Sequence, residues 1–349
     1  MSDRAPSPNL FDLAASLEVP ELHFCLRPEL GLEAIVAIHS TARGPALGGC
    51  RCVPYPDPMA AVEDVMRLAR AMSYKAAISD LPFGGGKSVV VMNPGLRDRA
   101  ACFAAFGDFV HHLDGRYIVT EDSGTGIADM DVIATRTSHV LGTSPDAGGC
   151  GNPSPSTAIG VCAGIESAVR HRLGREHLDG THVAIQGVGQ VGMALAGELH
   201  RRGARITVAD HNPQRAEACA TWFGAAVVAP GDIYRVAADL FAPCGLGAIL
   251  DEDTIPQLGA GIVAGSANNQ LATAEDGRRL HERGILYAPD YVINAGGLIH
   301  VALWGSEDIQ PRLAAIGVRL DQLFERAART GERPELVADS MAEAMLVSK

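Results

Sequence analysis

The chain has 349 residues, 47% of them hydrophobic and 20% charged, with a formal net charge of −12. This length favours two domains with a cleft between them, and this composition is typical of a soluble globular enzyme. The negative charge argues against a nucleic acid partner, because phosphate binding needs a concentrated basic surface. No apolar run approaches the roughly 20 residues of a membrane helix, which excludes a transmembrane segment.

The N-terminal segment carries early acidic side chains and no apolar stretch behind a basic start. It therefore does not resemble a secretory signal, and the cytoplasm is the expected compartment. The eight cysteines form no CxxC pair and have no histidines at zinc-binding spacing. We expect reduced thiols and no bound metal.

Up to about residue 141, strand-like runs alternate with helical stretches, which predicts an α/β domain. The expected strands cover 34–38, 88–92 and 117–120, and the expected helix covers 58–73. A segment rich in Gly, Pro, Ser and Asn follows at 142–155, as in a linker. We expect residues 1–141, with C-terminal helices at about 325–349, to form a substrate-binding, catalytic and oligomerisation domain.

Two lysines, Lys75 and Lys87, stand twelve positions apart, and the second follows three glycines. Isolated buried ammonium groups are disfavoured, so two of them held close by a helix, a turn and a glycine loop indicate a bound anion or a neutral lysine that acts as a base. Surface lysines beside a turn fit the same residues equally well. A phosphate-binding loop fails on spacing, because Leu81 stands where that motif needs glycine.

An acidic residue, Asp122, follows the strand expected at 117–120 and precedes a Gly-Thr-Gly turn. Ligands bind at strand ends in α/β sheets, and a carboxylate there could exchange protons with an amine. Taken alone, Asp122 is more often a turn or cap residue. Glu121, Asp129 and Asp131 are weaker candidates, the last two on a helix face.

The second half, expected at 142–324, predicts a Rossmann-type doubly wound domain that binds NAD. A helix is expected from Thr157 to Leu178, followed by strand, glycine turn, helix and a strand that ends at Asp210. The turn has GxGxxG spacing, which lets a pyrophosphate approach a helix N-terminus, while the acid binds the ribose and repels a 2′-phosphate. The expected contacts are Gly187, Val188, Gly189, Gln190, Val191, Gly192, Met193 and Asp210.

Ordered motifs along nearly the whole chain resemble the glutamate, leucine, phenylalanine and valine dehydrogenase family, and most closely its leucine branch. They are GPALGGCR (44–51), MSYKAA (72–77), GGGKSVV (84–90), EDSGT (121–125), GNPSPSTA (151–158), GVGQVG (187–192), APCGLGA (242–248), AGSANNQL (264–271) and YAPDYVINAGG (287–297). The resemblance raises the two lysines from an open question to expected site residues.

The resemblance implies oxidative deamination of an amino acid to a 2-oxo acid and ammonia. Lys75 would bind the α-carboxylate, Lys87 would polarise the water or carbonyl at Cα, and Asp122 would exchange protons with the amino group. Further implied substrate contacts are Gly48, Gly49, Met72 and Asn269. Further implied cofactor contacts are Thr157, Ala242, Cys244 and Asn268.

The substrate preference is inferred from the pocket positions. Leu47 and Val301 are apolar where the glutamate branch carries a lysine and a serine, so glutamate should bind poorly. Thr120 is bulkier than the alanine or glycine of the leucine and phenylalanine branches, which argues against a phenyl ring, although Leu298 is more typical of the phenylalanine branch. His300 departs from the expected asparagine or glutamine.

We therefore expect NAD-dependent deamination of L-leucine and other branched-chain amino acids by a homo-oligomer, a dimer or an octamer. A phenylalanine- or valine-preferring dehydrogenase is the alternative within the family. An inactive NAD-binding regulator on the same fold is disfavoured, because Lys75, Lys87 and Asp122 are all present.

Overall fold

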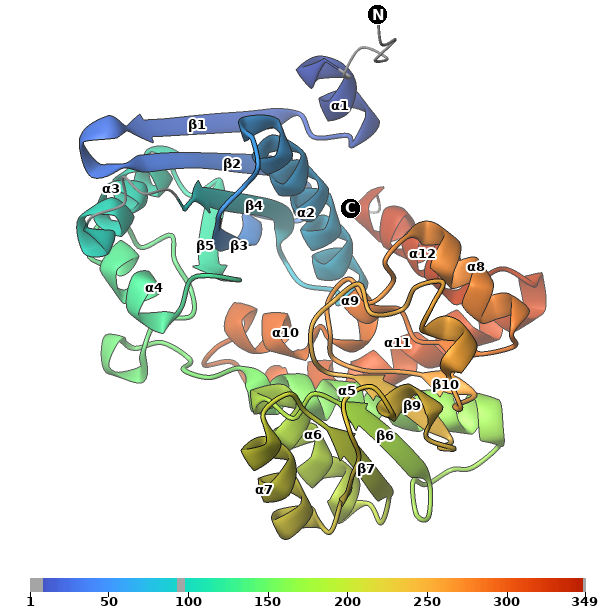
Figure 1. Cartoon of the computed structure of the whole chain (residues 1–349). Coiled ribbons are helices and arrows are strands. Elements are labelled where there is room, and N and C mark those ends of the chain that lie inside the picture. Colours follow the sequence, from blue (N-terminus) through green and yellow to red (C-terminus); the bar gives the residue numbers. More distant parts are fainter. Residues whose placement is uncertain (1–8, 93–97, 348–349) are drawn as a thin grey trace, which may run out of the picture. The chain divides into compact units, whose positions relative to one another are not determined.

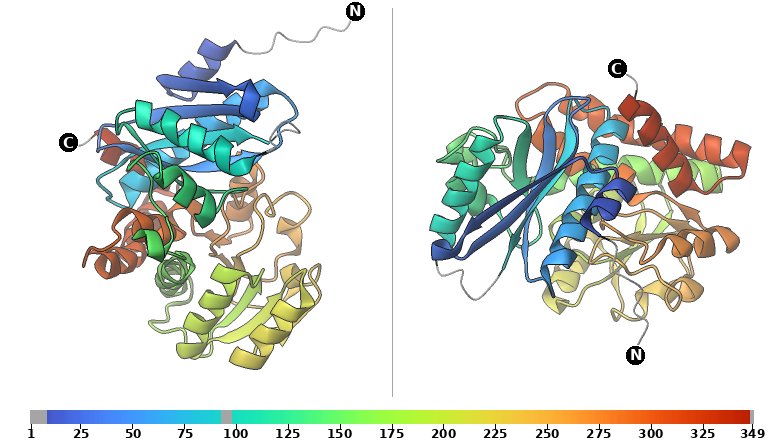
Figure 2. Two further views of the ribbon diagram at one scale, coloured as in Figure 1. Left: turned by 90° about the vertical axis from the view of Figure 1, so that its left-hand side faces the viewer. Right: turned by 90° about the horizontal axis from the view of Figure 1, so that it is seen from above.

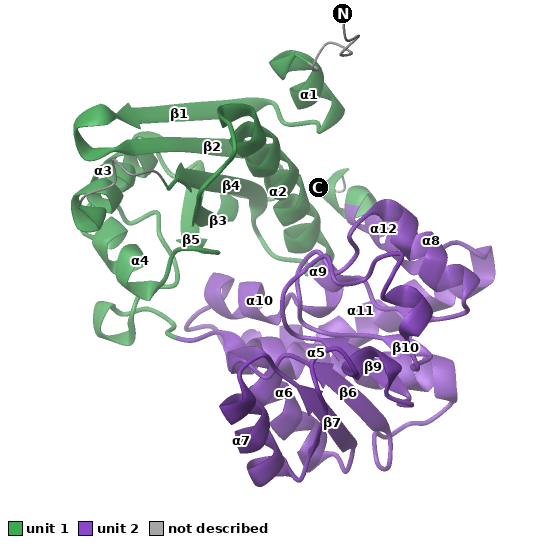
Figure 3. Cartoon of the chain, in the orientation of Figure 1, with its two compact units in different colours: residues 1–151, 343–349 green, residues 152–342 purple. Residues whose placement is uncertain are grey.

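The computed structural model describes residues 9–92 and 98–347. The chain divides into two compact units, residues 1–151 with 343–349 and residues 152–342 (Figure 3). Residues 1–8 of the segment that lacks a secretory pattern lie outside the described part. No helix in the described part is long and apolar enough to cross a membrane.

Unit 1 is built on a mixed sheet with strand order β1-β2-β4-β3-β5. β3 runs parallel to β4 and β5, whereas β2 is antiparallel to β1 and β4 (Figure 1). The elements are α1 (Leu10–Ser16), β1 (Glu21–Arg27), β2 (Leu32–Ser40), β3 (Ala46–Val53), α2 (Pro58–Ile78), β4 (Gly84–Val91), α3 (Arg99–His112), β5 (Tyr117–Glu121) and α4 (Ile127–Ala134). The expected strands and the expected helix of this region are confirmed.

Both faces of this sheet are covered by helices. On one face, α2 packs Val65, Met66 and Ala69 against Ile35 and Val89 of the strands. On the other face, α3 and α4 enclose a second cluster that includes Phe103, Phe106, Tyr117 and Ile133, and Figure 2 shows this layering from two further sides. Alternate residues of each strand therefore face different helices, which decides where each site side chain points.

The three glycines before Lys87 form the start of the central strand β4, and the expectation of a glycine loop is wrong. A Cβ at Gly85 would lie 2.0 Å from the backbone nitrogen of Ser73 in α2, and one at Gly86 would lie 2.9 Å from the ring of Tyr117. Glycine is needed here because a helix and an aromatic ring press on the strand from its two sides. The glycines therefore make room for the protein's own packing.

Unit 2 contains an all-parallel sheet with strand order β11-β10-β9-β6-β7-β8, the doubly wound arrangement that the sequence predicts. Its elements are α5 (Ser154–Leu173), β6 (His182–Gln186), α6 (Gln190–Arg201), β7 (Arg205–Ala209), α7 (Pro213–Phe223), β8 (Ala226–Val227), β9 (Leu240–Pro243), β10 (Ile262–Val263), α8 (Ala274–Glu282), β11 (Leu286–Tyr287), α9 (Asp290–Ile293), α10 (Gly296–Ala302) and α11 (Ile309–Thr330). α5 ends five residues before the expected Leu178, because Gly174 adopts a left-handed conformation with φ of 65°.

The unit boundaries differ from the expected 141/142 and 325. Residues after 141 stay with unit 1, since Leu141 N–H donates to Val119 O and Ser144 N–H donates to Asp131 Oδ1, each at 2.8 Å. Helix α11 belongs to unit 2 because it packs on α5, where a Cβ at Gly160 would lie 2.5 Å from Ile316. Only the end of α12 (Pro334–Val347) belongs to unit 1.

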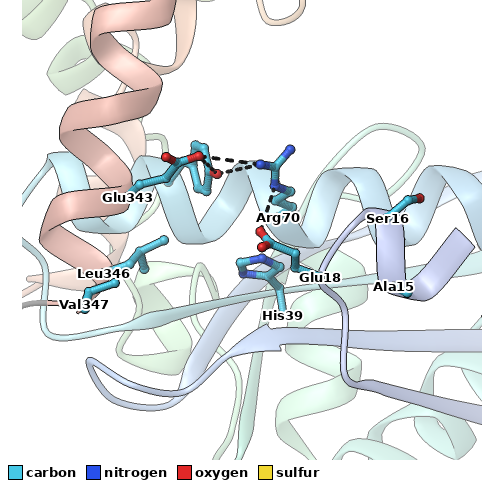
Figure 4. A pocket seen from close by; sticks show the side chains of 9 residues that line it. Ala15, Ser16, Glu18, His39, Arg70, Glu343, Leu346 and Val347 are labelled. Atoms are coloured by element: carbon cyan, nitrogen blue, oxygen red, sulfur yellow. Dashed lines mark hydrogen bonds and ion pairs between the residues drawn. The ribbon is translucent and has the colours of Figure 1, made fainter. Parts of the chain in front are cut away.

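The end of α12 is fixed to unit 1 by hydrogen bonds around a cavity of about 530 Å³ (Figure 4). Tyr74 of α2 donates its hydroxyl to Glu343 at 2.7 Å and accepts a hydrogen bond from Arg70 at 2.7 Å. The Arg43 guanidinium donates to the carbonyl oxygen of Met345 at 3.0 Å. These contacts make the last turns of the chain part of the packing around α2.

Candidate active site

The centre of the candidate site in unit 1 is an ion pair between Lys87 and Asp122. Lys87 lies in β4 and is 4% exposed, and its Nζ is 3.0 Å from Oδ2 of Asp122. Asp122 is the first residue after β5, and the turn that follows is fixed by Thr125, whose hydroxyl accepts the Asp122 N–H at 3.0 Å. The buried lysine therefore has its counter-ion at the end of β5, on the far side of the intervening strand β3, as charge burial requires.

Gly49 of β3 provides the space in which this pair forms. It is paired with Thr120 of β5, and a Cβ at position 49 would lie 3.0 Å from Lys87 Nζ and 2.7 Å from Asp122 Cβ. Real Cβ atoms do not approach other heavy atoms as closely as this second contact. Any larger residue would therefore displace the lysine, the carboxylate or both.

A second cation, Arg51, contacts the same carboxylate oxygen. Its Nε donates to Asp122 Oδ2 at 3.0 Å, and its Nη1 donates to Asp64 Oδ2 at 2.9 Å. Burial raises the pKa of Asp122, but the charges and hydrogen bonds of Lys87 and Arg51 outweigh burial and hold that pKa below its ordinary value. Asp122 is therefore ionised at neutral pH.

Sequence reasoning missed Arg51 although it ends the GPALGGCR motif. The available signal is its position two residues after Gly49, because alternate residues of a strand share one face of the sheet. Asp64 and Tyr55, which donates its hydroxyl to Asp64 at 2.7 Å, were also missed. They come from α2 and from the segment before it, and their convergence on Arg51 depends on tertiary packing.

The other expected substrate contacts of unit 1 lie on β3, β5 and α2. Thr120 is 8% exposed, and its hydroxyl is a buried group without a hydrogen-bond partner in the described part of the chain. Leu47 is fully buried in β3, and a Cβ at Gly48 would lie 1.8 Å from the carbonyl oxygen of Gly86. Met72 and Lys75 lie three residues apart on α2, the helix that covers the face of β4 shared by Gly85 and Lys87.

In unit 2, the expected glycine turn connects β6 to α6. Gly187 has a φ of 88°, and a Cβ at Gly192 would lie 2.0 Å from the carbonyl oxygen of Gly187, so both positions require glycine. Gly189 precedes α6 and makes no side-chain cap, and a Cβ there would meet nothing within 4 Å. The first turn of α6, which holds Gln190, Val191, Gly192 and Met193, therefore offers uncapped N–H groups beside open space, as an anion site needs.

Asp210 lies directly after β7 and supports this turn. Its Oδ2 accepts the N–H of Val188 at 2.8 Å, and its Oδ1 accepts the N–H of Asn212 at 2.7 Å. On the other side, Cys244 follows β9, and a Cβ at Gly187 would lie 3.1 Å from its carbonyl carbon. Ala242 of β9 is paired with Ile185 of β6. The expected acid, turn and β9 residues thus meet at the carboxyl ends of adjacent strands.

The remaining expected residues of unit 2 form a second group. Asn294 donates its side-chain amide to Asn268 at 2.7 Å, and Asn269 has a left-handed φ of 49°. A Cβ at Gly297 would lie 2.8 Å from the hydroxyl of Thr157, which places the start of α10 against α5. Leu298 and Val301 lie three residues apart on α10. His300, from the same helix, lies 2.9 Å from the hydroxyl of Ser156, measured from its Nδ1.

Comparison with known protein families assigns both halves of the chain. The model described as "Glu/Leu/Phe/Val dehydrogenase, dimerisation domain" matches residues 18–139, and the model "Glutamate/Leucine/Phenylalanine/Valine dehydrogenase" matches residues 212–315. The chain belongs to the glutamate/leucine/phenylalanine/valine dehydrogenase family. As a member of this family it is an amino acid dehydrogenase, an oxidoreductase that uses a nicotinamide cofactor.

Individual members of the family match over nearly the whole chain. Leucine dehydrogenase of Geobacillus stearothermophilus is 46% identical over 96% of this chain and 92% of its own length. Phenylalanine dehydrogenase of Bacillus thermotolerans is 42% identical over 93% and 88%. The crystal structure of L-tryptophan dehydrogenase from Nostoc punctiforme matches with a TM-score of 0.85 and 39% identity over 96% of this chain and 98% of that one. Relatives with three different side-chain preferences are thus similar to this chain.

Proposed function

We propose that this dehydrogenase catalyses the reversible, NAD-dependent oxidative deamination of L-leucine and other branched-chain L-amino acids. The products are a 2-oxo acid, ammonia, NADH and a proton. The observation that carries the proposal is the buried Lys87–Asp122 pair at 3.0 Å, which lies beside Gly49. Such a pair can move protons at both the carbon and the nitrogen of an amino acid.

Each site residue has a distinct role in this reaction. Lys75 binds the α-carboxylate as a cation. Lys87, when it is neutral, takes a proton from the water that attacks Cα. Asp122 is ionised and takes a proton from the substrate ammonium group, and it returns a proton to the departing ammonia. Because Lys87 and Asp122 share a hydrogen bond, a proton placed on one changes the affinity of the other.

The cofactor is proposed to be NAD, held by the glycine turn and Asp210. The uncapped N-terminus of α6 fits a pyrophosphate, and the Asp210 carboxylate keeps lone pairs for ribose hydroxyls after accepting the two backbone N–H groups. A 2′-phosphate next to this carboxylate would be repelled. When bound, NAD supplies the hydride acceptor for Cα.

The side-chain preference follows from the residue types at the pocket positions that the family resemblance implies. Leu47 and Val301 are buried and apolar, so a glutamate side chain would be desolvated without a partner. Thr120 reduces the space for a phenyl ring more than alanine or glycine would. Leu298 is more typical of the phenylalanine branch and favours the second candidate, a phenylalanine-preferring enzyme. For the assembly, we propose a homo-oligomer, a dimer or an octamer, which agrees with the description of the matching N-terminal family model as a dimerisation domain.

The test is an initial-rate panel of NADH formation with L-leucine, L-isoleucine, L-valine, L-phenylalanine, L-tryptophan and L-glutamate, repeated with NADP. We expect the highest kcat/KM with a branched-chain substrate, some overlap among the three, and little rate with glutamate or NADP. The highest kcat/KM on phenylalanine or tryptophan would refute the side-chain assignment. Reduction of NADP alone would refute the role of Asp210.

A further inference from the structure

We infer that Arg51 is a positioning residue that holds Oδ2 of Asp122 jointly with Lys87, so that the carboxylate keeps its place and its charge when Lys87 is neutral. The inference rests on the proposed function, in which Lys87 is neutral when it takes a proton from water. It assigns a task to a residue outside the predicted site.

The two oxygens of the Asp122 carboxylate differ in their contacts and therefore in their roles. Oδ2 of Asp122 receives both Lys87 Nζ and Arg51 Nε, each at 3.0 Å. In the described part of the chain, Oδ1 makes no hydrogen bond and is not a buried, unsatisfied atom. Oδ1 is therefore the oxygen that can exchange a proton with a substrate amine. Arg51 and Lys87 together fix the rotation that presents it.

Arg51 is itself held in place by a second ion pair, with Asp64. Its Nη1 donates to Asp64 Oδ2 at 2.9 Å, and Tyr55 donates its hydroxyl to the same oxygen at 2.7 Å. The side chains of Arg51 and Asp64 are only 19% and 15% exposed, so water screens this chain of contacts weakly. A guanidinium is planar, and contacts at Nε and Nη1 together fix its orientation. A lysine at position 51 could keep the charge but could not make both contacts in the same way.

The electrostatic consequence depends on which cations can be lost. A guanidinium stays protonated in proteins, whereas an ammonium group can give up its proton. Once Lys87 is neutral, Arg51 is the remaining cation in direct contact with the Asp122 carboxylate among the described residues. Without Arg51, a largely buried carboxylate would face a neutral amine and bind a proton more tightly.

Several titratable groups interact electrostatically with Asp122. They are Lys87 of β4, Arg51 and Cys50 of β3, Tyr55 after β3, and Tyr117 of β5, and Asp64 of α2 acts through Arg51.

The test is the pH dependence of kcat for three variants with L-leucine and NAD. In Arg51→Gln, we expect kcat to fall by between about tenfold and a hundredfold. The acidic limb of the pH profile should move to higher pH by about 1 unit, because the positive charge in contact with Asp122 is lost. In Arg51→Lys, the charge is kept, so the limb should stay near its wild-type position. In Asp64→Asn, a negative charge behind Arg51 is lost, so the limb should move to lower pH.

Opposite shifts in Arg51→Gln and Asp64→Asn distinguish positioning from a structural role, which would lower the active fraction at every pH. An unmoved limb in Arg51→Gln, or shifts of both variants in one direction, would overturn the inference. If Arg51→Gln does not fold, the direction of the Asp64→Asn shift decides. Asp122→Asn is measured alongside: retained activity in that variant would instead refute the proposed role of Asp122.

Discussion

Gly49→Ala is the substitution that most directly probes the space around the Lys87–Asp122 pair. The added Cβ would lie 2.7 Å from Asp122 Cβ, 2.8 Å from the carbonyl oxygen of Glu121 and 3.0 Å from Lys87 Nζ. Overpacking of this kind costs about 1–3 kcal/mol, and the reduced freedom of the unfolded chain returns about 0.4–1 kcal/mol. We therefore expect the free energy of unfolding to fall by about 1–2 kcal/mol.

The effect on turnover should be larger than the effect on stability. Displacing the pair by a few tenths of an ångström to 1 Å is expected to lower kcat by about a hundredfold. The assay is NADH formation with saturating L-leucine and NAD, together with urea unfolding. Gly126→Ala is the matched control, because a Cβ there would meet nothing within 4 Å, and its kcat should stay near wild type. Wild-type kcat in Gly49→Ala would refute the reasoning.

Three further predictions follow from contacts of the described residues. Asp122→Asn should destabilise the chain by about 3 kcal/mol at neutral pH, because Lys87 loses its counter-ion and Arg51 keeps only Asp64. The pKa of Asp122 is lowered in the folded state, so this stabilisation is present above its unfolded pKa and lost as the pH falls. The difference from wild type in urea unfolding should therefore shrink below about pH 4, and a constant difference would contradict the prediction. Asp210→Ala should raise KM for NAD by about tenfold and reduce the preference for NAD over NADP, while kcat changes little. An unchanged KM for NAD would exclude this acid from cofactor binding. Tyr74→Phe should lower the free energy of unfolding by about 1 kcal/mol without changing kcat, and equal stability would show that its bond to Glu343 contributes nothing.

The sequence is sufficient to predict the elements whose patterns are local. The glycine turn of unit 2 and the acid at Asp210 follow from spacing, because the conformations they need are set within one strand-turn-helix unit. Asp122 could be placed after a strand for the same reason. The local pattern around Lys87 fits a surface lysine equally well, and the family resemblance is what singles it out. Its partner Asp122 follows a strand and lies 35 positions later in the chain.

The features that the sequence does not reveal depend on contacts between distant segments. Gly84, Gly85 and Gly86 read as a loop because glycine is common in turns, yet Ser73 and Tyr117 press on them within a strand. The local signal for Arg51 is its position two residues after Gly49, and this signal does not identify its partners. Its partners Asp64 and Asp122 converge on it only when α2 and β5 have docked on β3. The division of α12 between the units likewise depends on Tyr74 and Arg43.

The central claim is that Lys87, paired with Asp122, carries out the chemistry at Cα. The most direct measurement is kcat for L-leucine in Lys87→Ala, with the dissociation constant for NADH determined by fluorescence in the same preparation. We predict that kcat falls by at least about a thousandfold, as for loss of a general base, while NADH binds as in wild type. A kcat within tenfold of wild type would contradict the account.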